Sequence, residues 1–189
     1  MVSRHNVIIV GLGLAGLSAV HTLKGRGLNI LLLDENRSPG GQYIRCVPRT
    51  LGKDSRPVRE RLKRIGYRLA KGLDFPGVSL RQGTQIIGLE AEGNVWALGE
   101  DGRIEKHYAE HIILATGARE CFLPFPGWTL PGVISTGAAQ ILIKSSGILP
   151  GRNILVGGSG PLPLALAGEI SAARGRVCGY WNQATWTQQ

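Results

Sequence analysis

A glycine-rich turn between two apolar segments constrains the fold of this chain more than any other feature. The apolar, mostly β-branched run 7–10 leads into Gly11-Leu12-Gly13-Leu14-Ala15-Gly16, and an apolar stretch at 17–26 follows. Short apolar runs rich in β-branched residues are typical of strands buried on both faces. The second stretch predicts a helix that Gly27 ends in a left-handed conformation. A further apolar run at 29–33 then predicts a second buried strand, which ends at Asp34.

This strand–turn–helix–strand pattern is typical of dinucleotide binding. The first glycine allows a tight turn, Gly13 lets the backbone approach a pyrophosphate, and Gly16 lets the helix pack closely on the strand. The free N–H groups of the helix start would face the phosphates. Asp34 lies 23 residues after Gly11, near the spacing of the carboxylate that binds ribose hydroxyls. A turn used for packing alone is the weaker interpretation, because three glycines cost backbone entropy.

The rest of the chain predicts further strands and helices. We expect a helix from a Ser55 cap to Lys71, because apolar residues recur there at steps of three and four. Short strands at 78–80, 85–89, 95–98 and 103–108 resemble an antiparallel meander, and 111–115 is a buried strand that ends in Ala115-Thr116-Gly117. A proline- and glycine-rich connector and a helix at 137–146 precede a strand at 153–156, Gly158-Ser159-Gly160, a helix at 164–174 and a strand at 176–180.

Together these elements predict an α/β chain with a Rossmann-like three-layer fold of the type that binds FAD or NAD(P). The antiparallel β-meander, at about 78–108, is expected as an insertion between parallel elements. We place a first nucleotide-binding domain at 1–122, a connector and helix at 123–150, and an incomplete second strand–helix–strand unit at 151–189. The second unit is therefore the start of another nucleotide-binding domain.

Composition excludes several other classes of protein. Apolar residues make up 43% of the 189 residues, enough for a core, and the net charge of +9 favours anionic partners. Three scattered cysteines without a C-x-x-C pair exclude a disulfide framework and a zinc ribbon. The four histidines show no metal-ligating pattern. The basic face of the 55–71 helix could attract nucleic acid, but no nucleic-acid motif accompanies it, so a solvated face is preferred.

The apolar run near the N-terminus is predicted to be neither a signal peptide nor a membrane span. Three glycines interrupt the run at 7–20, and His21 and Lys24 close it before the roughly 20 residues that a span requires. We therefore expect a soluble protein in the reducing cytoplasm.

Several motifs together resemble a known family. The N-terminal glycine pattern, the long insertion and Ala115-Thr116-Gly117-Ala118 resemble two-dinucleotide-binding-domain flavoproteins of the pyridine nucleotide-disulfide oxidoreductase type. The segments Ser38-Pro39-Gly40-Gly41-Gln42-Tyr43, 124–133 and Gly158-Ser159-Gly160-Pro161-Leu162 look more specifically like the FAD-containing subunits of hydrogen cyanide synthase and of octopine and nopaline oxidases.

The resemblance implies an FAD-dependent oxidoreductase subunit that relays reducing equivalents from the oxidation of a small amine or amino acid. Its partner would be a second flavoprotein subunit resembling amino-acid oxidases, or further copies of the chain. The residues implied at the FAD are Gly11, Gly13, Leu14, Ala15, Gly16, Asp34, Glu35, Gly41, Gln42, Arg45, Ala115, Thr116 and Gly117. Gly158, Gly160 and Pro161 would form a weaker second site for NAD(P). No acid–base residue is implied as catalytic, and no metal.

The chain also departs from the family pattern. Family members are about twice as long, which suggests that a C-terminal part is missing here. Pro163 stands where the second glycine pattern expects its third glycine, and Trp181 and Asn182 stand where an acid is expected. Two alternatives follow from these departures: an NAD(P)H-dependent flavin reductase that uses both patterns, and a non-catalytic dinucleotide-binding module.

Overall fold

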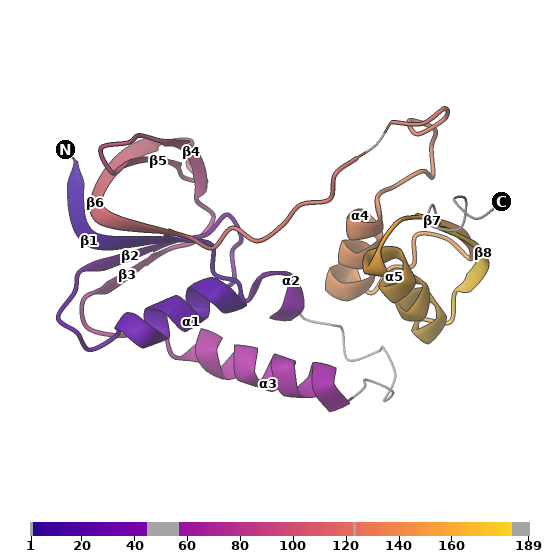
Figure 1. Cartoon of the computed structure of the whole chain (residues 1–189), viewed down its shortest axis with the longest axis horizontal. Helices are drawn as coiled ribbons and strands as arrows, with labels where there is room; N and C mark the ends of the chain where they lie inside the picture. Colours follow the sequence, from indigo (N-terminus) through magenta and orange to yellow (C-terminus); the bar gives the residue numbers. More distant parts are fainter. Residues whose placement is uncertain (1, 45–56, 123, 183–189) are drawn as a thin grey trace. The chain divides into compact units, whose positions relative to one another are not determined.

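The structure, a computed structural model, describes residues 2–44, 57–122 and 124–182. The described residues up to Gly117 form one compact unit, unit 1, and those from Ala118 onward form a second, unit 2 (Figure 1). Among the described residues no helix is both long enough and apolar enough to span a membrane.

Unit 1 is built on a six-stranded sheet with the strand order β3-β2-β1-β6-β5-β4. Its strands are β1 (Ser3–Val10), β2 (Ile30–Leu33), β3 (Val78–Arg81), β4 (Gln85–Leu89), β5 (Asn94–Leu98) and β6 (Ile104–Leu114). The first four strands in that order run parallel, whereas β5 and β4 are added antiparallel beyond β6. Three helices accompany them: α1 (Leu14–Leu23), α2 (Gly41–Ile44) and α3 (Pro57–Lys71).

Alternate residues of β1 pack on opposite sides of the sheet. Val7 and Ile9 join the side chains of α1 and the end of α3 in one buried cluster. Ile8 and Val10 join Val95 of β5 in another, beneath the antiparallel strands that curl over that face (Figure 1). The parallel strands are therefore covered by helices on one side and by β4 and β5 on the other. This arrangement explains their continuous apolar runs and confirms the predicted three-layer α/β fold.

The predicted meander is wrong in two respects. Val78–Arg81 pairs in parallel with β2, so this strand belongs to the parallel sheet and not to the meander. The segments predicted at 103–108 and 111–115 form one strand, β6, whose first half pairs both with β5 and with β1. The physical reason is that β1 begins at Ser3, four residues before its apolar run. This polar start of β1 pairs with β6 and keeps β6 as one continuous strand. Polar residues at the exposed end of a strand carry no hydrophobic signal for such pairing.

The helix starts also differ from the expectations. α1 begins at Leu14 and α5 (Pro161–Ala172) begins at Pro161, each three residues before the predicted start, because the glycine turn itself leads directly into the first helical turn. The predicted cap at Ser55 lies outside the described residues. The predicted helix at 137–146 is α4 (Thr136–Ile141) continued by a π-helical turn, η1 (Leu142–Ser146), and it ends at Gly147 with a φ of 67°.

Unit 2 has its own small core. Its two parallel strands, β7 (Asn153–Gly158) and β8 (Arg176–Asn182), pack with α4, η1 and α5 around Val156, Ile143 and Ile170. The side chain of Leu155, on β7, is 76% exposed. A hydrogen bond holds the start of the connector to α4, because the Glu120 carboxylate accepts the N–H of Gly137 at 2.7 Å.

A buried histidine lies in β6 of unit 1. His107 is 4% exposed and its Nδ1 lies 2.8 Å from the hydroxyl of Ser3. Burial lowers the pKa of His107 below its ordinary value of 6.5, although the nearby Glu105 carboxylate opposes the shift. The charges of His5 and Arg81 lower the pKa further. The folded chain therefore favours the neutral imidazole.

We predict that the free energy of unfolding falls as the pH drops below about 6.5, because the unfolded chain then binds a proton that the folded chain resists. Urea unfolding between pH 7.5 and pH 5 measures this dependence. A His107→Leu variant should show a flatter profile over that range, whereas His111→Gln, at an exposed position of the same strand, should keep the original slope. An unchanged slope in His107→Leu would contradict the assignment.

Candidate dinucleotide-binding site

The carboxyl ends of β1, β2 and β6 meet at one edge of the sheet in unit 1. The N–H of Gly11 donates to the carbonyl of Leu33 at 2.8 Å, and the N–H of Ala115 donates to the carbonyl of Val10 at 2.7 Å. The glycine turn therefore leaves β1 between the ends of its two neighbouring strands. In open parallel sheets, ligands bind outside this edge.

Packing inside the protein explains three of the glycines at this edge. A Cβ at Gly11, where φ is +96°, would overlap the carbonyl of Ala115, and a Cβ at Gly16 would overlap the carbonyl oxygen of Gly11. Gly41 has a φ of +55°, and a Cβ there would lie 2.9 Å from the Cα of Gly13. Each of these glycines is required by the close approach of neighbouring backbone.

Gly13 is different, because nothing among the described residues requires a glycine there. Its φ of −71° and ψ of −172° suit any residue, and a Cβ would meet no atom within 4 Å. Gly13 is also the N-cap of α1 and makes no side-chain capping bond. The first-turn N–H groups of a helix have no acceptor within it. Within the part of the chain that the structure describes, the start of α1 is thus an open surface with unused donors and a positive dipole, which suits a phosphate.

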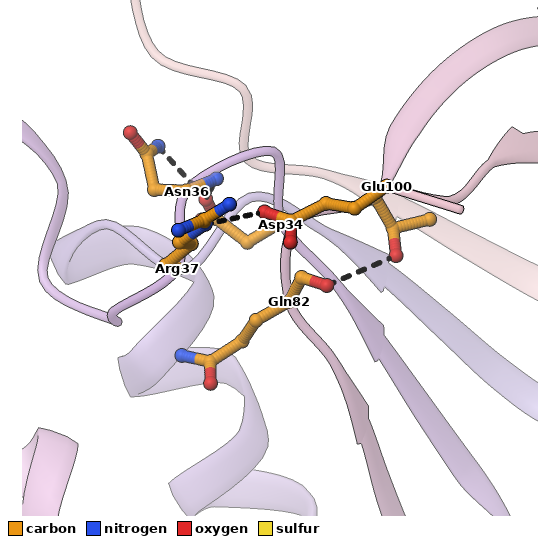
Figure 2. A network of polar contacts seen from close by, with 6 residues as sticks. Asp34, Asn36, Arg37, Gln82 and Glu100 are labelled. Carbon is orange, nitrogen blue, oxygen red and sulfur yellow. Dashed lines mark hydrogen bonds and ion pairs between the residues drawn. The ribbon is translucent and has the colours of Figure 1, made fainter. Parts of the chain in front are cut away.

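Asp34, at the carboxyl end of β2, is held rigidly beside this turn. Its side chain is 6% exposed, and its Oδ2 accepts the N–H of Leu12 at 2.5 Å. Its Oδ1 accepts both the backbone N–H and the side-chain amide of Asn36, at 2.7 Å and 2.8 Å (Figure 2). Two carboxylate oxygens offer about four acceptor positions, so Asp34 can still accept a bond from a ligand hydroxyl.

A cavity of about 400 Å³ lies beside the Asp34 turn. It is lined by Glu35, Asn36, Gly83, Gln85, Leu98, Gly99 and Glu100. An ion pair links the turn to the β5–β6 connection, with 2.7 Å between the Nε of Arg37 and the Oε1 of Glu100 (Figure 2). The cavity is therefore bounded by the loops that follow β2, β3 and β5, at the same sheet edge as the glycine turn.

The structure brings most of the predicted residues to this edge. Ala115 and Thr116 lie against Gly11, Leu14 and Ala15 begin α1, and Glu35 lines the cavity. Gln42 lies in the short helix α2 and its side chain is exposed, while Gly117 ends unit 1 with a φ of +73°. Arg45 lies outside the described residues.

Sequence reasoning missed three contributors to the site. Leu12 is fully buried and supplies its backbone N–H to Asp34, a role that no side-chain pattern reveals. Asn36 fixes the other carboxylate oxygen, and an asparagine two residues after an aspartate is a turn signal that could have indicated it. Gly83 has a φ of +62° and a Cβ there would overlap the Glu100 carboxylate.

The second glycine pattern, in unit 2, is built differently. Gly158 ends β7 with a φ of +150°, and a Cβ there would lie 3.0 Å from the Cγ of Pro163. Gly160 is the N-cap of α5, with a φ of +83° and open space around it, and Pro161 is the first residue of the helix. Among the residues that the structure describes, no three His, Cys, Asp or Glu side chains gather as a metal site would require.

The fold and the open glycine turn define unit 1 as a Rossmann-type unit, the kind of fold that binds dinucleotides. The chain belongs to the pyridine nucleotide-disulphide oxidoreductase family, whose pattern matches residues 5–178. This confirms the family predicted from the sequence, and with it a place among flavin-dependent oxidoreductases.

The related sequences include components of several oxidases. An opine oxidase subunit from Rhizobium meliloti (strain 1021) is 37% identical over 175 residues, which cover 89% of this chain and 36% of that protein. The hydrogen cyanide synthase subunit HcnB of Pseudomonas aeruginosa is 36% identical over 179 residues, covering 93% of this chain and 38% of that protein. The chain thus spans a little over a third of the length of these relatives.

Solved structures support the fold. L-proline dehydrogenase from P. horikoshii matches with a TM-score of 0.73 at 20% identity, over 96% of this chain and 36% of that chain. Bacillithiol disulfide reductase from Bacillus cereus matches with a TM-score of 0.62 at 19% identity, over 95% of this chain and 59% of that chain.

Two glycine substitutions should distinguish a glycine that packing requires from a glycine that faces an open site. We predict that Gly16→Ala lowers the free energy of unfolding by about 1–3 kcal/mol or more, because its methyl group would overlap the Gly11 carbonyl. Gly13→Ala should change it by less than about 1 kcal/mol, because the methyl group enters open space. Urea unfolding of both variants measures the difference, and equal losses would contradict the geometry described for Gly13.

Proposed function

We propose that unit 1 binds FAD at the start of α1. The observation that supports this most strongly is Gly13, a glycine that internal packing does not require, at the open start of a helix with unused N–H donors. Membership of a flavin-dependent family supports FAD as the ligand. The same edge of the sheet carries the fixed carboxylate of Asp34.

Each part of the site has a distinct task in this proposal. The N–H groups of Leu14, Ala15 and Gly16 face the pyrophosphate, and Asp34 accepts a ribose hydroxyl. Gly41 brings α2 close to the turn, and Ala115 and Thr116 line its other side. Bound FAD supplies the hydride and electron chemistry, while the protein supplies position and electrostatics. No residue of the chain is proposed as an acid or base.

The chain as a whole is proposed to be one component of a multi-subunit FAD-dependent oxidoreductase. It would relay reducing equivalents from the oxidation of a small amine or amino acid, together with a partner subunit. Similar sequences named as subunits of opine oxidase, hydrogen cyanide synthase and sarcosine oxidase support a multi-subunit enzyme. A reducing cytoplasm is the proposed compartment, and the free, exposed thiols of Cys121 and Cys178 are compatible with it.

Titration of the full chain with FAD tests the proposed cofactor. We predict saturable binding by calorimetry and a flavin absorbance spectrum that stays with the protein on gel filtration. Gly13→Ala should weaken FAD binding at least about tenfold, equivalent to 1.4 kcal/mol, because its methyl group occupies the space next to the phosphates.

The matched control is Gly168→Ala in α5, where an added Cβ also meets no atom within 4 Å. This variant should bind FAD as the original chain does. The proposal fails if the folded chain takes up no FAD, or if Gly13→Ala and Gly168→Ala bind FAD equally well.

A further inference from the structure

We propose that unit 2, although built like a nucleotide-binding unit, does not bind NADH or NADPH. The family to which the chain belongs implies a pyridine nucleotide, and the second glycine pattern is where a second dinucleotide would be expected. Three features of unit 2 that can be compared directly with unit 1 argue against such a site. The inference deepens the proposed function and rests on it for the flavin in unit 1.

The first feature is the number of N–H donors at the start of the helix. α1 and α5 both begin directly after a glycine N-cap that makes no side-chain capping bond, Gly13 in one and Gly160 in the other. The first three residues of α1 all carry a backbone N–H, whereas the first and third residues of α5 are Pro161 and Pro163. Proline has no N–H. Only the middle donor remains at α5, so it offers a phosphate one amide instead of three.

The second feature is the packing of the helix on the strand. In unit 1 the third glycine, Gly16, lets α1 lie directly against the carbonyl of Gly11. In unit 2 the same position holds Pro163, whose ring Cγ would lie only 3.0 Å from a Cβ built on Gly158. The proline side chain is buried between helix and turn. A proline ring therefore stands beside the turn in unit 2 where unit 1 has a glycine without a side chain.

The third feature is the charge at the end of the second strand. In unit 1, Val10 pairs with Leu33, which places Asp34 level with Gly11. In unit 2, Gly158 pairs with Asn182. The register therefore assigns Asn182 the position that Asp34 occupies in unit 1, and asparagine carries no negative charge for the ribose hydroxyls. Two apolar side chains near the start of α5 are also exposed, Leu162 and Leu164.

All three features weaken binding of a pyridine nucleotide. They are the loss of donors, the ring in place of glycine and the missing carboxylate. Phosphate binding at a helix start depends on several N–H groups acting with the helix dipole. Unit 2 retains the dipole but few of the groups. Pyridine nucleotides therefore do not reduce the chain through unit 2, and the reducing equivalents proposed for the flavin come from another donor.

Equilibrium dialysis of the full chain with NADH and NADPH, in excess FAD, tests this inference. We expect no saturable binding of either nucleotide up to about 1 mM, the upper end of ordinary substrate affinities. Saturable binding below that concentration would overturn it. FAD uptake is measured in the same samples, so a failure of the proposed flavin site is seen separately from nucleotide binding at unit 2.

A restoring variant tests whether the three features cause the absence of pyridine-nucleotide binding in unit 2. Pro161→Ala, Pro163→Gly and Asn182→Asp together return the donors, the glycine and the carboxylate. This variant should show saturable NADH binding below about 1 mM, where the original chain shows none. A matched control replaces Pro131 and Pro150, which lie outside α5, with alanine and should leave NADH binding absent. If the triple variant does not fold, Pro163→Gly provides the same measurement. A folded restoring variant that binds no more NADH than the original chain would overturn the assignment to these residues.

Discussion

The backbone contact between α1 and the turn after β1 is the constraint on which the rest of unit 1 depends. At Gly16 the helix lies against the carbonyl of Gly11, and a single methyl group would overlap it. This contact directs the start of α1 toward the carboxyl edge of the sheet, where Ala115 and Asp34 also lie. The helix then covers one face of the parallel strands and buries the apolar residues of that face. Packing and the proposed ligand site therefore share one short segment.

The carboxylate of Asp34 shows how the same edge becomes a polar site inside an apolar unit. A buried charge is tolerated when hydrogen bonds compensate for lost water, and here three N–H groups do so from Leu12 and Asn36. The bonds also fix the orientation of the carboxylate before any ligand arrives. A rigid acceptor reduces the entropy that binding must overcome, which suits a site that retains a cofactor.

The two units share the same local structure at the helix start but differ in its chemistry. Both place a glycine at the N-cap of an apolar helix that follows a parallel strand. Fold similarity alone therefore does not establish binding, and the difference lies in Pro161 and Pro163, which remove donors without preventing a helix. Proline is tolerated in the first turn, because N–H groups there have no partner inside the helix. The architecture is therefore retained in unit 2, although the start of α5 has fewer N–H donors than the start of α1.

By itself the sequence determined the glycine turn, the buried strands and the acid at position 34, because these depend on local periodicity and on fixed spacing. Only the tertiary structure decided that β3 joins the parallel sheet and that β6 is one strand of eleven residues, since strand partners are set by contacts between distant segments. It also decided which glycines serve packing and which leaves open space, a distinction that separates Gly16 from Gly13. The two glycines give the same signal in the sequence, and only their surroundings in the folded structure distinguish them.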